Sequence, residues 1–530
     1  MKVLLQRIRR AVRVRFCVTK PEQDFLNIIK KLADVPGKQE TSASNKGYFL
    51  VEAMGVNQSM SYTQGLFAKT GQLEGCIPVI VMSRYVRKHK AVFCDMGINN
   101  IELHQKVLTL SDRFKAYRWA NKVYSQIKSP EELLKFTYDG IPMGSYAYST
   151  YLFKHMTGTL KKVTPDIKKY LRESYLNYIY IERLIAKYDP KFVVLTNNTY
   201  IECGTLFQTA LNHGITAYVA VWPASNKVSI KRYDRNTNTK DLCVVNPSHE
   251  EWGYIINRNR KEWLDKGRGW MERRLRGEDK AFGGMDSAVG KPWITKKEVY
   301  NMLKIDANKK VALVCSHVMW DDPVIYTSIY RDYYWWWLET VKIINNIEDV
   351  TWILKAHPGE MDTLGRRTHQ TPIRSLDVIS GIRLKSNVIF LDSGLQYNNY
   401  SLMQVADALV TVRGTVGMEY ATQGIPVITA GTGSYSCAGF DINCKTVEEY
   451  KNALQNVSKL DRLKQDKIDK ALIFTYFYMA GGTSIEVKGL PQDFKIENLT
   501  ELSITEYLSD GAWRDIIRRM MLKNDCREIC

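Results

Sequence analysis

One stretch, residues 407–440, constrains the fold of this chain more than any other part of the sequence. An apolar strand is expected over residues 408–412, a tight turn at 413–415 opens a helix, and a second strand is expected over 425–430. A strand, a glycine turn, a helix and a second strand form the unit from which parallel sheets are built. The stretch therefore predicts a parallel α/β domain.

The turn in this stretch carries groups that suit an anion. Arg413, Gly414 and Thr415 would present a guanidinium, backbone N–H groups and a hydroxyl toward one point at the start of the helix. Glu419 stands one helical turn deeper, where a carboxylate can accept hydrogen bonds from ribose hydroxyls. Phosphate beside a sugar is the combination found in a nucleotide sugar. In the alternative interpretation, this is an ordinary β-α-β unit whose glycines only make tight turns.

Length and charge narrow the class of protein. A chain of 530 residues is longer than one ordinary domain, so two α/β domains are expected. The 75 basic and 56 acidic residues give a net charge of +19, which favours a polyanionic partner. The basic residues are spread along the chain without an RNA-binding, zinc-finger or helix-turn-helix signature, so no nucleic-acid partner is expected. An acidic glycan or an anionic membrane surface suits the charge better.

Cysteine usage and the N-terminus bear on localisation. The ten cysteines are scattered singly without zinc-ligand spacing, which is typical of a reduced, cytoplasmic chain. No apolar run reaches the roughly 20 residues of a transmembrane helix. Residues 1–45 form a basic arm whose first part, residues 1–18, combines apolar with basic side chains. This arm either lies on an anionic bilayer, peripherally at the inner face of the plasma membrane, or packs on the protein.

Alternating strand and helix patterns over residues 46–225 predict a first Rossmann-like domain. A loop over residues 137–155 combines glycine, proline, hydroxyl and aromatic residues that suit sugar rings, and Asp139 is its only carboxylate. Asp139 is therefore the candidate general base or nucleophile of this half. An aspartate beside glycine is more commonly a turn residue, which is the alternative.

A second set of polar residues follows the strand expected at 192–195. Asn197, Asn198 and Tyr200 stand at its carboxyl end, where open α/β sheets bind ligands. They are the candidate acceptor contacts. Capping of the next helix by Asn198 or Thr199 is an equally good interpretation.

The remaining chain divides into a linker, a second domain and a tail. Residues 226–305 are dominated by charge and predict a helical linker, and residues 306–480 predict the second Rossmann-like domain. Residues 481–530 predict a helical tail. Its last helix has one apolar side against arginines, so it is expected to pack on the first domain, with a lipid-facing helix as the alternative.

A buried strand expected at residues 311–315 ends in a polar loop. His317, Asp321 and Asp322 cluster in that loop, and His317 and Asp321 are candidates for catalysis.

The next strand of the second domain ends in Lys355, His357 and Pro358. A lone histidine on a core strand is usually structural, but this one lies in the loop at the strand's end, beside a lysine. Because parallel strands place such loops on the same edge of the sheet, these residues are expected to share one crevice with the Arg413 turn.

Several segments together resemble a known family. SHVMWDDP, WILKAHPGE and ALVTVRGTVGMEYATQGIPVITAGTGSYSCAGF are similar to successive blocks of bacterial capsule and surface-polysaccharide glycosyltransferases of the GT-B type. That broad group includes β-Kdo transferases. The similarity is good over residues 309–454 and fainter over residues 139–221.

The resemblance implies two Rossmann-like domains that face each other across a cleft, with a C-terminal closing helix. The second domain would hold a CMP- or UDP-linked sugar, and the first a lipid-linked or growing glycan acceptor. The donor is then a substrate, and neither a cofactor nor a metal is implied. In that group the His-Pro pair and the later Gly-Thr-Val-Gly-Met-Glu block are associated with the donor. The donor-site residues are accordingly Lys355, His357, Pro358, Arg413, Gly414, Thr415, Gly417, Glu419 and Tyr435.

One departure from the family pattern concerns catalysis. Ser145 and Ser149 stand where the first domain of the family is expected to carry acidic residues. The role of catalytic carboxylate therefore moves to Asp139, or to Asp321 and Asp322 across the cleft.

The sequence is compatible with three functions. The first is a glycosyltransferase that moves a sugar, Kdo or a related acidic sugar being one candidate, from a nucleotide donor to a bacterial capsule or surface polysaccharide. The second is a polyol-phosphate transferase of the CDP-glycerol type, which would share the basic nucleotide site. The third is a non-catalytic scaffold for glycan assembly that keeps the fold and has lost the chemistry.

Overall fold

The structure is a computed structural model that describes residues 20–35, 46–54, 58–83, 89–224, 226–236, 249–278, 288–321, 328–360, 371–479, 484–490 and 498–522. The membrane-binding segment expected at residues 1–18 lies outside the described residues, as does Asp322.

The first domain is built on a seven-stranded sheet with the order β13-β6-β5-β4-β1-β2-β3. The five strands from β3 to β5 are parallel, and their order, 3-2-1-4-5, is that of a Rossmann fold. The strands are β1 (Tyr48–Ala53), β2 (Ile77–Met82), β3 (Ile101–Leu103), β4 (Phe192–Leu195), β5 (Thr216–Ala224), β6 (Lys227–Tyr233) and β13 (Ile485–Glu486).

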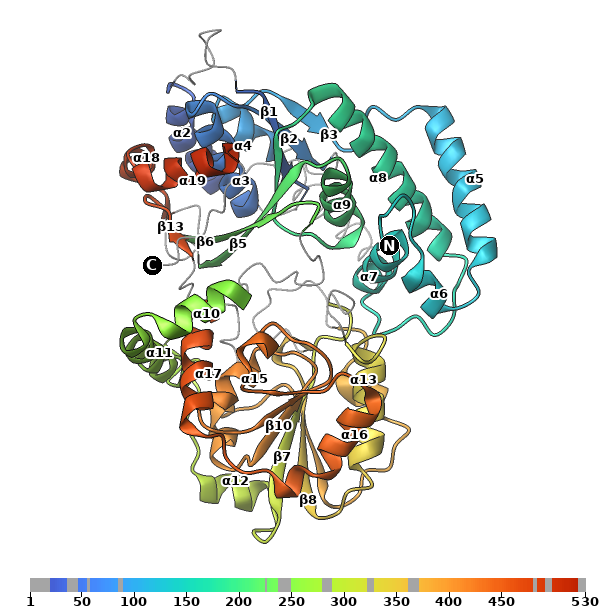
Figure 1. Cartoon of the computed structure of the whole chain (residues 1–530), viewed down its shortest axis with the longest axis vertical. Helices are drawn as coiled ribbons and strands as arrows, with labels where there is room; N and C mark the ends of the chain where they lie inside the picture. Colours follow the sequence, from blue (N-terminus) through green and yellow to red (C-terminus); the bar gives the residue numbers. More distant parts are fainter. Residues whose placement is uncertain are drawn as a thin grey trace.

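Helices cover both faces of this sheet, and three of them form a side wall (Figure 1). The wall consists of α5 (Leu110–Gln126), α7 (Met143–His155) and α8 (Ile167–Tyr188). Both α5 and α7 pack on α8. The other helices of the domain are α2 (Lys20–Ile29), α3 (Gln58–Leu73), α4 (His89–Asp95), α6 (Pro130–Lys135) and α9 (Thr205–Asn212).

The second domain contains a six-stranded, wholly parallel sheet with the order β12-β11-β10-β7-β8-β9. This is again the Rossmann order, so the expected pair of Rossmann-like domains is confirmed. The strands are β7 (Lys310–Cys315), β8 (Val350–Lys355), β9 (Val388–Leu391), β10 (Ala408–Thr411), β11 (Val427–Thr429) and β12 (Ile442–Asn443). The helices are α12 (Lys296–Leu303), α13 (Tyr333–Ile344), α14 (Ser375–Val378), α15 (Val416–Ala421), α16 (Val447–Gln455) and α17 (Gln465–Met479).

The domain boundary expected at residue 225 is wrong, because β6 pairs antiparallel with β5 and extends the first sheet. The linker expected at 226–305 is also not a solvated connection. Its helices α10 (His249–Asn257) and α11 (Arg260–Leu275) pack on the second domain, where Trp263 and Trp270 are buried with residues of α17. Because charged residues dominate this segment, its sequence pattern did not predict the buried tryptophans.

The C-terminal segment returns to the first domain, as expected. α19 (Gly511–Met521) lies against α3, next to α18 (Glu501–Leu508) (Figure 1). Trp513 is fully buried, stacks edge-on to Phe67 with ring centroids 4.8 Å apart, and donates from Nε1 to Thr70 Oγ1 at 2.8 Å. Because the apolar side of α19 is covered by the core, the alternative of a lipid-facing last helix is wrong.

The two domains are joined by a buried polar cluster around Asp332. Asp332 caps α13 by accepting from the Trp335 N–H, and it also accepts from two hydroxyls of the first domain, Tyr148 at 2.5 Å and Thr159 at 2.6 Å. Arg331 forms an ion pair with Glu131 of the first domain beside it. Burial raises the pKa of Asp332, and the hydrogen bonds that its carboxylate accepts offset part of that increase.

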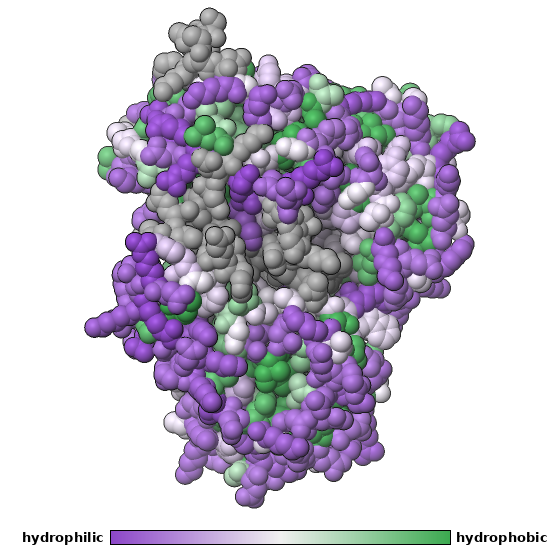
Figure 2. All heavy atoms as spheres, viewed as in Figure 1, coloured by the Kyte–Doolittle hydropathy of each residue, from purple (hydrophilic) through white to green (hydrophobic). Residues whose placement is uncertain are grey.

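The surface of the described part is mainly hydrophilic on the face shown in Figure 2, with hydrophobic groups lying between the hydrophilic ones. Among the described helices, none has the length and the apolar run that crossing a membrane would require.

We expect Trp513→Ala to destabilise the first domain by about 3–5 kcal/mol, because it leaves a large cavity and removes the hydrogen bond to Thr70. Urea unfolding followed by far-UV circular dichroism measures the loss. The matched control is Leu502→Ala on α18, whose side chain is 65% exposed and whose truncation should change stability by less than about 0.5 kcal/mol. Equal stability of the two variants would show that α19 is not part of the core.

Candidate functional site

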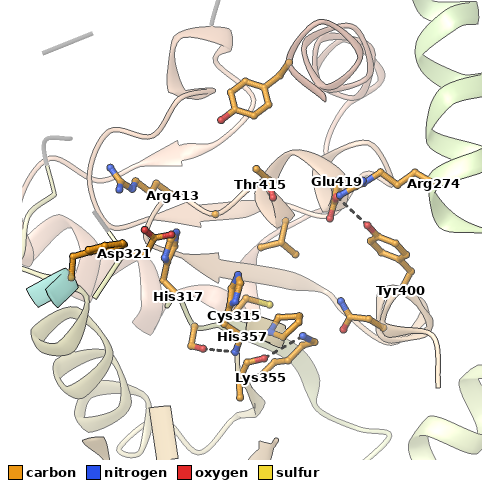
Figure 3. Close-up of a pocket in the computed structure, with 18 of the residues that line it drawn as sticks. Arg274, Cys315, His317, Asp321, Lys355, His357, Tyr400, Arg413, Thr415 and Glu419 are labelled. Carbon is orange, nitrogen blue, oxygen red and sulfur yellow. Dashed lines mark hydrogen bonds and ion pairs between the residues drawn. The ribbon is translucent and has the colours of Figure 1, made fainter. Parts of the chain in front are cut away.

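A pocket with a volume of about 730 Å³ lies between the two domains (Figure 3). The second domain supplies most of its wall, and the first domain contributes Phe153, Asn197 and Tyr200. The histidines, arginines, lysine and carboxylates on its wall are Arg274, His317, Asp321, Lys355, His357, Arg413 and Glu419.

Three neighbouring strands of the second sheet end at this pocket. In the sheet, β7 lies between β10 and β8, and all three strands run in the same direction. Their carboxyl ends therefore deliver the loops that begin at Ser316, Ala356 and Val412 to one edge. The His357 loop and the Arg413 turn both line this pocket, as expected from the parallel strands.

Lys355 is the last residue of β8 and is only 5% exposed. Its Nζ donates to the carbonyl oxygen of Ala356 at 3.4 Å, and within the described ranges no carboxylate forms an ion pair with it. Burial lowers the pKa of Lys355, because the charged form loses its hydration. A buried ammonium on the wall of a pocket is stabilised when an anion occupies that pocket.

Arg413 follows β10 and lies across the pocket from Lys355. Its guanidinium carbon stands 5.3 Å from the centroid of the Tyr333 ring, a cation–π contact that fixes the direction of the side chain. The planar guanidinium suits bidentate binding of phosphate oxygens.

Glu419 lies on α15 and forms a buried ion pair. Its Oε1 accepts from Arg274 Nε at 2.7 Å and from the Tyr400 hydroxyl at 3.0 Å, and the Glu419 and Arg274 side chains are each less than a tenth exposed (Figure 3). Glu419 was expected to accept hydrogen bonds from ribose hydroxyls. In the structure the charge of its carboxylate is already compensated by Arg274. The pair holds α11 against the Arg413 turn.

His357 is held by two neighbours in the loop after β8. Its backbone N–H donates to Ser316 Oγ at 2.7 Å, and its Nδ1 accepts from the Gly359 N–H at 3.0 Å. In the neutral ring the proton is therefore on Nε2. Ser316 in turn donates to the buried carboxyl of Glu360 at 3.4 Å, and burial raises the pKa of Glu360 to about 7.

His317 and Asp321 both lie in the loop after β7. Burial, with smaller contributions from His357 and Arg413, lowers the pKa of His317 well below its usual range, so this ring is neutral near pH 7. Its ring stacks on Tyr333 with centroids 4.2 Å apart. Asp321 is exposed to the pocket, and the Tyr200 hydroxyl of the first domain donates to its Oδ1 at 3.5 Å. Asp321 is thus the candidate carboxylate that the structure brings to the pocket.

Asp139, the other candidate carboxylate, is not on the wall of this pocket. It is exposed in a tight turn between Tyr138 and Ile141, has a left-handed φ of 51°, and accepts from the Tyr178 hydroxyl at 2.8 Å. The turn interpretation of Asp139 is therefore the one that the structure supports.

The three candidate acceptor residues separate in the structure. Asn197 and Tyr200 line the pocket, whereas Asn198 is buried behind it. Asn197 also accepts from the backbone N–H and the hydroxyl of Thr199, at 2.7 and 2.6 Å, so it organises the turn at the same time.

Three of the expected donor residues shape the Arg413 turn from within. The Gly414 N–H donates to Thr411 Oγ1 at 3.2 Å, and not toward the pocket as expected. Tyr435 is fully buried and donates to the Gly414 carbonyl at 3.1 Å. A Cβ on Gly417 would lie 2.1 Å from the Tyr435 hydroxyl oxygen, so only glycine fits there. Gly417 and Tyr435 therefore shape the Arg413 turn and do not line the pocket themselves.

Arg274 and Tyr400 are pocket residues that the sequence did not reveal. Arg274 belongs to the segment interpreted as a linker, and its burial follows from Trp263 and Trp270, which recur at the seven-residue spacing of one helix face. The seven-residue spacing of these tryptophans within a highly charged helix is the sequence signal that could have predicted the burial of Arg274.

The chemistry of the pocket is that of an anion site. Lys355 and Arg413 line it as cations and His357 offers an N–H, while of the two carboxylates on its wall Glu419 is buried in an ion pair and Asp321 is exposed. Within the part of the chain that the structure describes, no three His, Cys, Asp or Glu side chains are grouped to hold a metal ion.

We expect Arg274→Met to destabilise the second domain by about 3–5 kcal/mol, because it leaves the Glu419 carboxylate buried without its cation. The double variant Arg274→Met/Glu419→Leu should recover most of that loss. Thermal and urea unfolding of the set gives the coupling energy. Arg268→Met is the control, since this arginine lies on the same helix with its side chain half exposed. A double variant no more stable than the single one would show that the two charges do not act as a pair.

Comparisons with known proteins give matches among solved structures and to one protein family. Curated protein sequences give no match. Among solved structures, KpsC of Thermosulfurimonas dismutans, a beta Kdo 2,4 transferase, aligns at 12% identity over 54% of this chain and 79% of its own, with a TM-score of 0.33. HepE of Anabaena in complex with UDP and glucose aligns at 12% identity over 87% of this chain and 99% of its own, with a TM-score of 0.27. The UDP-GlcNAc 2-epimerase of Neisseria meningitidis bound to UDP-GlcNAc aligns at 9% identity over 87% and 100%, with a TM-score of 0.23.

The family comparison matches residues 292–478 to the family described as "Capsule polysaccharide biosynthesis protein". This range runs from the residues before α12 to α17, so it contains the whole second sheet. Apart from Arg274, it also contains every pocket residue that the second domain contributes. The second domain of this chain, with its part of the pocket, thus has the sequence pattern of the capsule polysaccharide biosynthesis proteins.

Proposed function

We propose that this chain is a glycosyltransferase of capsule or surface-polysaccharide synthesis, which moves a sugar from a nucleotide-activated donor to a growing or lipid-linked glycan. One observation carries the proposal: within the segment that matches the capsule family, the buried Lys355 ammonium and the Arg413 guanidinium face one pocket between two Rossmann-like domains. The pocket is large enough for a nucleotide sugar.

The donor phosphates are assigned to Lys355, Arg413 and the Nε2–H of His357. In sugar transfer, the bond between the anomeric carbon and a phosphate oxygen breaks, and negative charge grows on the departing phosphate. Fixed cations in a site of low polarity stabilise that charge without reorganising. The Lys355 ammonium, whose burial is unfavourable without an anion, should gain most from it.

The acceptor is assigned to the side of the pocket formed by the first domain. Phe153 is 40% exposed there and packs edge-on to Trp320, while Asn197 and Tyr200 offer an amide and a hydroxyl. An exposed aromatic ring with hydrogen-bonding neighbours suits the apolar face and the hydroxyls of a sugar ring.

The general base is assigned to Asp321. It lies where the acceptor side meets the donor side, and its carboxylate can take the proton of the attacking hydroxyl. The oxygen of that hydroxyl then bonds to the anomeric carbon as the sugar–phosphate bond breaks, and the nucleotide leaves on the cationic side. The neutral His317 beside it orients the loop.

We expect Arg413→Ala and Lys355→Met each to weaken nucleotide binding roughly ten- to a hundredfold, because each removes a charge-assisted contact to phosphate. Calorimetry with UDP and with CMP should show the loss, while the weak binding of uridine and cytidine should not change. Arg374→Ala is the control, since this arginine pairs with Asp392 outside the pocket. A nucleotide affinity that both pocket variants retain would remove the main support for the proposal.

We expect Asp321→Asn to reduce sugar transfer at least about a hundredfold while nucleotide affinity stays unchanged, because the amide cannot accept the proton. Asp139→Asn should keep most of its turnover, since Asp139 lies in an exposed turn. Transfer is scored by release of nucleotide from a panel of CMP-, UDP- and GDP-sugars with CDP-glycerol included. Turnover of CDP-glycerol alone would replace the proposal by polyol-phosphate transfer, and nucleotide binding without any turnover would indicate a scaffold.

A further inference from the structure

The helix α5 exposes large apolar side chains on one of its faces. Leu110, Phe114 and Tyr117 are 85%, 61% and 56% exposed, and their spacing of four and three residues places them on one face of the helix. Val107, just before the helix, is 44% exposed. The face that packs on α8 carries Ala116 and the Trp119 ring, which stacks on Tyr175 with ring centroids 4.6 Å apart, whereas Leu110, Phe114 and Tyr117 lie on the exposed face. We call Leu110, Phe114 and Tyr117 the outer stripe of α5.

The charges of α5 are of one sign at the surface. Arg113, Lys115, Arg118 and Lys122 lie on the helix, and Arg118 stands over the ring of Phe114, with its guanidinium carbon 6.0 Å from the ring centroid. The helix has one acidic residue, Asp112, which is buried.

Asp112 is removed from the surface by its contacts. Both of its carboxylate oxygens accept from Arg183 of α8, at 2.7 Å each, and it completes a capping box with Thr109. Hydrogen bonding to Arg183 holds its pKa well below the usual range, so this carboxylate stays ionised and paired. The exposed face of α5 therefore combines large apolar groups with cations and no exposed acid.

We propose that the outer stripe of α5 docks the protein on an anionic membrane surface. Leucine and phenylalanine would enter the boundary between headgroups and acyl chains, tyrosine would lie at the interface, and the flanking arginines and lysines would contact lipid phosphates. The helix runs along one side of the molecule, at the outer edge of the first domain, where nothing in Figure 1 covers it. Hydrophobic groups lie among hydrophilic ones over this edge in Figure 2.

A membrane suits this face better than a soluble polyanion does. A free acidic polysaccharide would pair with the four cations and would gain little from Leu110, the most exposed large apolar residue of the stripe. A lipid surface uses both features at once. The proposal is independent of the glycosyltransferase assignment, because vesicle binding needs neither donor nor acceptor.

The test measures sedimentation of the full chain with large vesicles of phosphatidylcholine containing about one third phosphatidylglycerol, an anionic interface of the kind that such helices recognise. The variant Leu110→Ser/Phe114→Ser/Tyr117→Ser should bind at least about tenfold more weakly, since it removes three apolar groups from the interface. Leu110→Ser alone should show a smaller loss, and it keeps the test valid if the triple variant folds poorly. Leu502→Ser, an exposed leucine on α18, is the matched control and should bind like the wild type.

The charge contribution is tested with Arg113→Gln/Arg118→Gln/Lys122→Gln, which should also weaken vesicle binding and should flatten its dependence on salt. Binding to a soluble acidic polysaccharide is measured in parallel. Wild-type vesicle binding by both stripe variants would overturn the proposal. So would a stripe variant that loses polysaccharide binding and keeps vesicle binding, because the occupant would then be a glycan.

Discussion

The parallel alignment of β10, β7 and β8 is the constraint on which the site depends. Parallel strands end on the same edge of a sheet, so three loops that are far apart in the sequence meet there. Lys355, His357 and Arg413 reach the pocket for this reason, and the two cations then face one space.

Buried charge is handled in two different ways around this pocket. Arg274 and Glu419 neutralise each other within the wall, and their pairing attaches α11 to the Arg413 turn. Lys355 has no ion-pair partner among the described residues, and its Nζ donates to the Ala356 carbonyl on the wall of the pocket.

The sequence predicted the fold better than the identity of each site residue. Strand and turn patterns are local, so the stretch around Arg413 predicted a β-α-β unit of the second domain, and the strand–helix alternation over residues 46–225 predicted the first. The roles of Asp139 and Tyr435 depended on direction and burial, which a pattern of residue types does not contain. Arg274 was missed because its helix is charged on the outside, although Trp263, Trp270 and Met271 are buried on its inner face. The β5–β6 hairpin was missed because an antiparallel strand after five parallel ones leaves no mark in local periodicity.

The polar cluster at Asp332 also determines how the two domains can move. Asp332 is held by Tyr148 and Thr159 of the first domain, and Trp320, close to it in the chain, packs edge-on to Phe153. A rotation of one domain against the other that keeps these contacts must pivot about this corner. The separation of Asp321 and Tyr200 would then stay nearly constant, while parts of the pocket farther from the corner open and close. Such a hinge would let a nucleotide enter and leave without disturbing the place where the new bond is made.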